Sequence, residues 1–210
     1  MHAFHRVALV SAIALFGATA AHANLLSNAG AENGDLSGWT AGGDSNPFVD
    51  NGSFNPGINP FDGSYAFVGG HGDLGSLTQN VSLAGSPGAT IATVSFWEQG
   101  LNQGTPSDDD YISLTYRDAS NAVIGTVSTP EIDSHLNAWQ QYTGSFAIPA
   151  GTVSIDYTMN FVRHAGGDLD GYVDDNSLTV GSAVPEPASG VLLLAGVLGL
   201  GLAARKRQAR

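Results

Sequence analysis

Alternation of apolar and polar residues constrains the fold of this chain more than any other feature. In the stretch TVSIDYTMNF, the side chains of Val153, Ile155, Tyr157, Met159 and Phe161 fall on one side, and polar side chains fall on the other. Because successive side chains of a strand point to opposite faces, this period of two residues predicts a half-buried β-strand. The pattern recurs in YISLTYRD and IATVSFWEQ, and shorter strands are predicted for SLTQNVSL, SYAFVGG and YVDDNSLTV.

Turn residues separate the predicted strands. Most of the 28 glycines lie between the alternating stretches, and a helical period is almost absent. Many short strands joined by turns rich in glycine and proline are typical of a β-sandwich or barrel. Residues 41–64 have little periodicity, and we expect a long loop region there, with room for one strand.

The N-terminal end has the layout of a secretory signal peptide. Residues 1–23 contain Arg6, then an apolar run at 7–16, then the small-residue sequence Ala21-His22-Ala23. This order predicts export, with cleavage after Ala23. A membrane anchor is the competing interpretation, but the apolar run is too short to span a bilayer.

The C-terminal end has a different layout. Residues 188–204 are 17 uncharged residues, which is the lower limit for a membrane-spanning helix, and a basic tail follows them. The tail is expected to stay on the cytoplasmic side, because positive charge near a spanning helix is retained there. A buried core helix is the alternative, but this run has no polar face.

Residues 24–183 remain as one predicted domain, long enough to bury a sizeable core. The chain has no cysteine, so packing or a metal ion must stabilise it in place of disulfides. The domain holds 18 acidic residues and only two basic ones, Arg117 and Arg163. Phosphate binding needs clustered Lys and Arg, so nucleic acid is not an expected partner, whereas divalent cations suit an excess of carboxylates.

The C-terminal pattern of residues 184–210 resembles the PEP-CTERM sorting signal. The motif consists of Val184, Pro185, Glu186 and Pro187, and it precedes the apolar run and the arginine-rich tail. Proteins with this signal are exported by Gram-negative bacteria and are thought to be processed at the membrane by an exosortase. The resemblance implies a precursor anchored by a transmembrane helix, then delivery to the cell envelope, the cell surface or an exopolysaccharide matrix.

The domain resembles the galactose-binding-like jelly rolls that serve as carbohydrate-binding modules. Six stretches carry the resemblance in order: NLLSNAGAENGDLSGWT, FDGSYAFVGG, GSLTQNVSL, PGATIATVSFWEQG, AWQQYTGSFAIPAG and DGYVDDNSLTV. The resemblance implies an all-β jelly-roll sandwich. The chain departs from the family at Ala31, where Phe is usual, and at Asn176, where an aliphatic residue is usual, so a polar group is expected at a core position.

The resemblance also implies a structural Ca²⁺ ion that ties the first strand to the last. The matching carboxylates are Glu32, Asp62, Asp174 and Asp175. Carboxylate and carbonyl oxygens form the cage that this hard cation prefers, although solvated surface carboxylates would give the same sequence pattern. The run Asp108–Asp110 is interpreted as a solvated loop, because three adjacent carboxylates repel one another.

A glycan-binding surface is predicted from the polar sides of three strands. Sugar binding uses an aromatic ring that stacks on the sugar and polar groups that fix its hydroxyls. The candidate residues are Trp97, Gln99, Tyr111, Arg117, Asp156 and Asn160. In this hypothesis Tyr111 and Arg117 lie beside an accessible Trp97, with Asp156 and Asn160 opposite.

Other aromatic residues leave alternatives open. Trp97 is also compatible with a core position, because tryptophan is usually well buried. Trp39 and Trp139 are interpreted as core residues near strand starts, and the phenylalanines of the long loop form a second candidate platform. Those phenylalanines are Phe48, Phe54 and Phe61.

Catalysis is not expected from this sequence. The chain contains neither Gly-x-Ser-x-Gly nor His-Glu-x-x-His, and the histidines at 71, 135 and 164 are interpreted as isolated surface residues. A pair of carboxylates at glycosidase spacing would arise by chance among so many. The sequence therefore predicts an exported, non-catalytic glycan-binding protein; a structural or adhesive matrix protein and a polysaccharide hydrolase are the alternatives.

Overall fold

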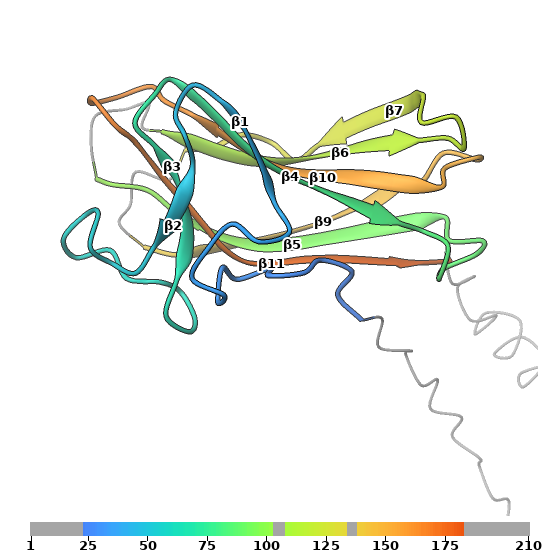
Figure 1. The fold of residues 1–210 in the computed structure, drawn as a ribbon, viewed down its shortest axis with the longest axis horizontal. Coiled ribbons are helices and arrows are strands. Elements are labelled where there is room, and N and C mark those ends of the chain that lie inside the picture. Colours follow the sequence, from blue (N-terminus) through green and yellow to red (C-terminus); the bar gives the residue numbers. More distant parts are fainter. Residues whose placement is uncertain (1–22, 103–107, 134–137, 183–210) are drawn as a thin grey trace, which may run out of the picture.

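The computed structural model describes residues 23–102, 108–133 and 138–182. These residues form two β-sheets that lie face to face, which confirms the predicted sandwich (Figure 1). No helix within the described ranges is long and apolar enough to cross a membrane. The predicted signal peptide, sorting motif and transmembrane helix fall outside these ranges, except for Ala23.

Sheet A is the upper layer in Figure 1 and is antiparallel throughout. Its strand order is β1 (Thr40–Gly43), β4 (Leu74–Ser82), β10 (Ser154–Val162), β6 (Asp109–Arg117) and β7 (Val123–Ser128), with the short β8 (Ile132–Asp133) paired to β6. The registers place Asp156 opposite Asn80 of β4 and Thr115 of β6. Polar residues of neighbouring strands therefore stand side by side across this sheet.

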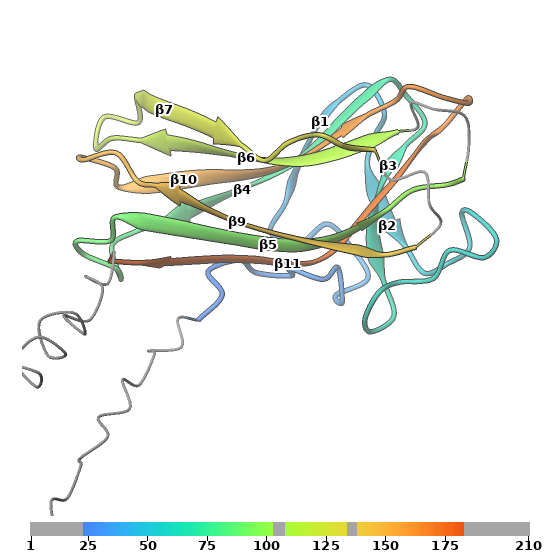
Figure 2. The same cartoon turned by 180° about the vertical axis from the view of Figure 1, so that it is seen from behind.

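Sheet B forms the second layer and is also antiparallel (Figure 2). Its strand order is β2 (Phe48–Asp50), β3 (Ala66–Gly70), β11 (Leu169–Gly181), β5 (Ile91–Gln99) and β9 (Gln140–Ala147). Successive long strands alternate between the sheets: β4 and β6 belong to sheet A, and β5 between them belongs to sheet B. The connections between these strands cross from one sheet to the other. Side chains of consecutive long strands therefore lie on different faces of the sandwich.

The core fills the space between the two sheets, as the alternation predicts. Ile155, Tyr157, Met159 and Phe161 of β10 are fully buried, and Val153, which precedes the strand, is exposed. The inward residues of β5 and β6 complete the same cluster: Ala92, Val94, Phe96, Ile112, Leu114 and Tyr116. Full burial of one large apolar side chain stabilises a fold by roughly 1.5–3 kcal/mol, so this cluster is the main source of stability.

Trp39 confirms its predicted place in this core. Its ring packs edge-on against Phe67 at 5.3 Å and against Tyr157 at 6.0 Å, measured between ring centroids. The indole N–H donates to the carbonyl of Asn28 at 3.1 Å, so burial leaves no donor unpaired on this side chain. The ring thereby joins both sheets to the N-terminal segment.

Asn176 is the polar core residue that the sequence predicted, and it is 1% exposed. Its side chain accepts a hydrogen bond from the Tyr157 hydroxyl at 2.8 Å and donates to the carbonyl of Ala29 at 3.0 Å. The Asn24 side chain in turn donates to the carbonyl of Asn176 at 2.8 Å. A buried amide is tolerated when its hydrogen bonds are made, and here these bonds fasten the N-terminal segment to β11.

The region expected to be a long loop contains two short strands, β1 and β2, rather than one. The following residues, 51–65, pack over the outer face of sheet B, where Ile58 joins a small second cluster with Ala66, Val68 and Tyr172. Trp139 packs half-buried against this cluster and donates to the carbonyl of Asn59 at 3.0 Å. The expectation that Trp139 lies in the core is therefore wrong, and the residue lies at the margin of this second cluster.

Candidate functional site

Two of the carboxylates predicted to bind calcium, Glu32 and Asp174, contact one turn, residues 61–65, which also contains Asp62. Glu32 accepts hydrogen bonds from the backbone N–H groups of Ser64 and Tyr65, both at 3.0 Å. Asp174, from β11, accepts from the N–H groups of Phe61 at 2.9 Å and Asp62 at 3.2 Å. The N-terminal segment and β11 are thus both held at this turn, and backbone N–H groups make the contacts, whereas the resemblance implies a Ca²⁺ ion.

Gly30 lies between the side chains of Glu32 and Asp174. A Cβ built on Gly30 would lie 3.3 Å from Asp174 Oδ1 and 3.9 Å from Glu32 Cγ, so Gly30 separates the two side chains. Burial raises the pKa of Asp174 to about 7, although hydrogen bonds from three backbone N–H groups lower it in part. A pKa this high makes the charge of Asp174 sensitive to any nearby cation.

The chemistry of this donor set fits a hard cation, since it consists of carboxylate oxygens on three segments. Asp62 and Asp175 are exposed, and Asp175 has a positive φ of 48° at the irregular pairing of β11 with β5. Each oxygen of Glu32 and Asp174 already accepts a backbone N–H. Calcium at this turn therefore stays a prediction.

The six residues predicted to bind glycan do not share one surface. Trp97 and Gln99 belong to β5 of sheet B, whereas Tyr111, Arg117, Asp156 and Asn160 belong to β6 and β10 of sheet A. The expectation that Trp97 lies beside Tyr111 and Arg117 is wrong, because these residues face outward on opposite layers of the sandwich. β5 and β6 are consecutive in the sequence, but the jelly-roll order places them in different sheets.

Trp97 lies on the outer face of sheet B, opposite the buried Val94 and Phe96, and is half-buried rather than part of the core. Phe61 stacks on it with ring centroids 3.8 Å apart and an angle of 16° between the planes. Phe61 therefore occupies the position where a sugar was expected to stack. Gln99 is buried, at 4% exposure, and is not open to a ligand.

The phenylalanines of the long loop do not form one platform. Phe48 and Phe54 pack edge-to-face at 5.1 Å, and both contact the ring of His71, while Phe61 packs against Trp97. His71 is not isolated either, because its Nδ1 lies 2.9 Å from a carboxylate oxygen of Asp168. The second candidate platform is thus divided between two separate aromatic contacts.

The outer face of sheet A keeps four of the six predicted residues together. Asp156 accepts from Asn80 Nδ2 at 2.6 Å and from Arg117 Nε at 2.6 Å, so three strands are joined by one carboxylate. Asn160 donates to Ser113 Oγ at 3.0 Å and to the Tyr111 carbonyl at 3.3 Å. We call this surface the polar face.

Hydroxyl groups fill the rest of the polar face. Thr78 and Thr158 hydroxyls lie 2.9 Å apart, and a longer contact of 3.4 Å joins Thr115 to Thr126. A groove with a volume of about 430 Å³ begins at Asn80 and continues between the turns that carry Pro87 and Thr152. Polar groups with fixed orientation beside a groove of this size are typical of a small-ligand site.

The run Asp108–Asp110 is not a solvated loop, because all three residues are at least 92% buried, with exposures of 1%, 8% and 0%. Asp108 accepts from the backbone N–H groups of His164 at 2.9 Å, Ala165 at 3.1 Å and Asp170 at 2.6 Å. Asp109 pairs with His164, so this histidine is not an isolated surface residue. His135 lies outside the described residues.

Asp110 points between the sheets, where a Cβ at Gly171 would collide with its carboxylate. Neither of its oxygens has a hydrogen-bond partner in the described part of the chain. Burial raises the pKa of Asp110 well above its ordinary value, and the charges of Glu98, Asp108 and Asp109 raise it further. The sequence analysis did not predict this acidic end of the sandwich. A signal was present, because Asp110 is in phase with the inward residues Ile112 and Leu114 of the same strand.

Comparison with known proteins agrees with the sorting signal and with the fold. Residues 183–208 match the PEP-CTERM protein-sorting motif, which includes the predicted residues 184–187. Comparison with curated protein sequences finds no match. The structural neighbours include jelly-roll carbohydrate-binding modules, so the fold predicted from the resemblance is confirmed.

Two of these modules match over almost their whole length. TmCBM61, solved in complex with β-1,4-galactotriose, has a TM-score of 0.52 and 26% identity, and the match covers 76% of this chain and 99% of that one. The xylan-binding domain CBM22-1 of Paenibacillus barcinonensis Xyn10C has a TM-score of 0.53 and 16% identity, over 80% of this chain and 100% of that one.

A third neighbour is part of a much larger protein. The enzymatically active domain of bacteriophage CBA120 tailspike protein 4 has a TM-score of 0.55 and 16% identity. The match covers 75% of this chain and only 21% of the tailspike chain. At this identity the likeness shows a common fold, and the activity of the larger protein is not carried over with it.

Proposed function

We propose that this chain is an exported, non-catalytic protein that binds glycans at the cell surface or in the matrix around the cell. The observation that carries the proposal is the polar face of sheet A, on a fold whose neighbours include complete carbohydrate-binding modules. TmCBM61, matched over 99% of its length, was solved with β-1,4-galactotriose bound. A galactan is therefore the first ligand to test.

The chemistry of the polar face suits sugar hydroxyls. Asp156 offers acceptors, while Arg117 and Asn160 offer donors, and hydroxyl groups of a sugar need both. Because Asp156 already bonds to Arg117 and Asn80, these side chains are held in position before a ligand arrives. Such preorganisation lowers the entropy lost on binding.

Tyr111 is the aromatic residue for stacking at this face. It is partly exposed and pairs with Asn160 across the two strands. A single partly exposed ring gives a modest stacking area, so we expect dissociation constants on the order of micromolar to millimolar, about −8 to −4 kcal/mol. Binding of this strength suits a protein that meets a repeating polysaccharide at many sites.

The test is binding of the full chain to soluble β-1,4-galactan, with xylan and a β-glucan as further probes, by affinity gel electrophoresis. Asn160→Ala is expected to weaken binding at least tenfold. The matched control is Gln141→Ala, because Gln141 is an amide on the outer face of sheet B that donates to a serine hydroxyl, Ser95, at 3.2 Å. Asn160→Ala removes the hydrogen bonds to Ser113 Oγ and to the carbonyls of Tyr111 and Thr158, and Gln141→Ala removes the hydrogen bond to Ser95 on the opposite face.

Three results would contradict the proposal in different ways. Absence of wild-type binding to every glycan would favour a structural or adhesive matrix protein. Loss of binding in Gln141→Ala but not in Asn160→Ala would move the site to sheet B. Release of reducing ends from any probe would indicate a hydrolase.

Delivery to the surface rests on the sorting motif at residues 183–208. We propose that an exosortase removes this segment from an anchored precursor, so the mature protein ends near Pro187. Replacement of Glu186 by Ala should leave the precursor in the membrane fraction. Intact peptides from residues 188–210 in the released protein, found by mass spectrometry, would refute this step.

A further inference from the structure

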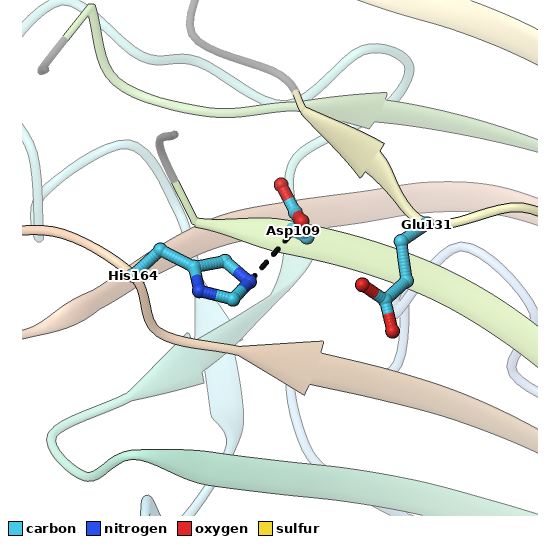
Figure 3. Close-up of side chains that lie close together, drawn as sticks. All are labelled: Asp109, Glu131 and His164. Carbon is cyan, nitrogen blue, oxygen red and sulfur yellow. Dashed lines mark ion pairs between the residues drawn. The ribbon is translucent and has the colours of Figure 1, made fainter. Parts of the chain in front are cut away.

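Three side chains at one end of sheet A form a group that resembles a metal site. Asp109 begins β6, Glu131 precedes β8, and His164 follows β10. One ligand atom from each lies within 4.8 Å of the other two. Figure 3 shows His164 and Glu131 approaching Asp109 from opposite sides, with His164 Nε2 at 3.2 Å from Asp109 Oδ2.

The strand pairing and the neighbouring residue Asp108 position this group. Asp109 is opposite Val162 in β10, two residues before His164, and opposite Asp133 in β8, two residues after Glu131. Asp108 accepts the backbone N–H groups of His164 and the residue after it, at 2.9 and 3.1 Å. The backbone under the imidazole is thus fixed by the residue that precedes Asp109, as outer-sphere contacts fix ligands in known metal sites.

The charge around the group favours a cation. Asp110, the next residue, is fully buried and has no hydrogen-bond partner among the described residues, and Glu98 and Asp108 add charge to the same region. Arg163 stands next to His164, but its guanidinium pairs with Asp73 and with the carbonyl of Gly166. A dication at Asp109 would offset the repulsion among these carboxylates.

We propose that Asp109, Glu131 and His164 bind a divalent transition-metal cation of the Zn²⁺ class, with water completing its coordination. An imidazole with two carboxylates suits Zn²⁺ and similar ions, whereas Ca²⁺ prefers oxygen ligands alone. Ligands about 2.0–2.2 Å from one ion lie within about 4 Å of each other, so only small side-chain movements are needed. Glu131 and His164 are exposed and free to make them.

The test is calorimetric titration of the untagged full chain with ZnCl₂, and the readout is the difference between wild type and variants. His164→Gln and Glu131→Gln should each weaken the Zn²⁺ affinity at least tenfold and remove the rise in melting temperature that Zn²⁺ produces. The matched control is His71→Gln. His71 also pairs with an aspartate, Asp168 at 2.9 Å, but belongs to no three-ligand group among the described residues.

The melting temperatures of the variants distinguish loss of Zn²⁺ binding from loss of the fold. The side chains at 131 and 164 are exposed, so the metal-free melting temperatures should match that of wild type, and Glu131→Gln decides if His164→Gln unfolds. Unchanged Zn²⁺ affinity in both variants would overturn the proposal. An equal loss in His71→Gln would also overturn it, because the ion would then not distinguish the three-ligand group from a simple pair.

Discussion

Asp174 and Asp110 are two buried aspartates in the same sandwich, and their surroundings are opposite. Asp174 is 1% exposed and accepts N–H groups from Phe61, Asp62 and Asp175. Asp110 is 0% exposed and accepts no hydrogen bond from any residue that the structure describes. Burial raises the pKa of both, but the N–H groups limit the rise for Asp174 to about 7, whereas no N–H group among the described residues lowers the pKa of Asp110.

The difference shows what each aspartate does for the fold. A carboxylate with several N–H donors fastens backbone segments together, so Asp174 holds the turn at 61–65 against β11. A carboxylate without donors, close to other carboxylates, destabilises the fold unless it carries a proton or faces a cation. Asp174 therefore stabilises the contact between the turn and β11, whereas Asp110 destabilises the fold by charge repulsion when it is ionised.

The largest expected effect is the pH dependence that Asp110 produces. Its pKa is higher in the folded than in the unfolded state, so folding takes up a proton, and the stability present at low pH is lost as the pH rises. In EDTA, Asp110→Asn should therefore be more stable than wild type. The gain should grow from about pH 4, by about 1.4 kcal/mol per pH unit, while the folded carboxyl stays protonated.

Urea denaturation at several pH values measures this gain. Asp118→Asn is the control, because Asp118 accepts backbone N–H groups in an exposed turn and is not part of the buried group. A gain that is the same at pH 4 and pH 8 would mean that Asp110 does not titrate in this range.

Removal of Asp174 tests the other half of the comparison. Asp174→Ala in EDTA should lower the free energy of unfolding by about 3 kcal/mol, because the backbone donors at Phe61 and Asp62 lose their acceptor. Asp62→Ala is the control, since the Asp62 side chain is exposed and its backbone N–H is kept. Equal losses in the two variants would show that the turn is not held by Asp174.

Calcium would make the two aspartates differ further. An ion that binds only the folded state stabilises it by about 2.7 kcal/mol at 100 times its dissociation constant. Millimolar Ca²⁺ should raise the melting temperature of wild type, and Glu32→Ala or Asp174→Asn should abolish the rise. Identical melting curves in Ca²⁺ and in EDTA would end the calcium prediction at this turn.

The alternation predicts the sandwich and the strands β3 to β6, β10 and β11, because each of these strands carries its own signal, but it does not single out β1, β2, β7 or β8. In β10, for example, Ile155 and Tyr157 face the core and Asp156 faces solvent, as the alternation requires. The face of Trp97 within its strand was likewise predicted correctly. Alternation does not encode the partner of each strand, so it does not reveal that Trp97 on β5 and Tyr111 on β6 lie in different sheets.

Buried charge is the second feature that the sequence does not predict. Asp108–Asp110 looked like a solvated run because polar residues are usually exposed. The structure buries them because Asp108 satisfies three backbone N–H groups of a distant loop, 164–170, and Asp109 meets His164 there. Such contacts join residues more than 50 positions apart, and local sequence patterns carry no information about them.

The smallest expected effect links the turn at 61–65 to Trp97. The backbone N–H of Phe61 donates to Asp174, and the ring of Phe61 stacks on Trp97. Phe61 therefore connects the aspartate to the indole. Trp97→Ala should lower the free energy of unfolding by about 1–2 kcal/mol, less than loss of a core aromatic residue, because the indole is only half-buried. In the Asp174→Ala background the same substitution should have less effect, by about 0.5–1 kcal/mol, because the turn no longer holds Phe61 in place. Thr93→Ala, an outward residue of the same strand, is the control and should behave additively with Asp174→Ala. Full additivity of Trp97→Ala would mean that the ring contact persists without the aspartate, and that Asp174 fastens the backbone alone.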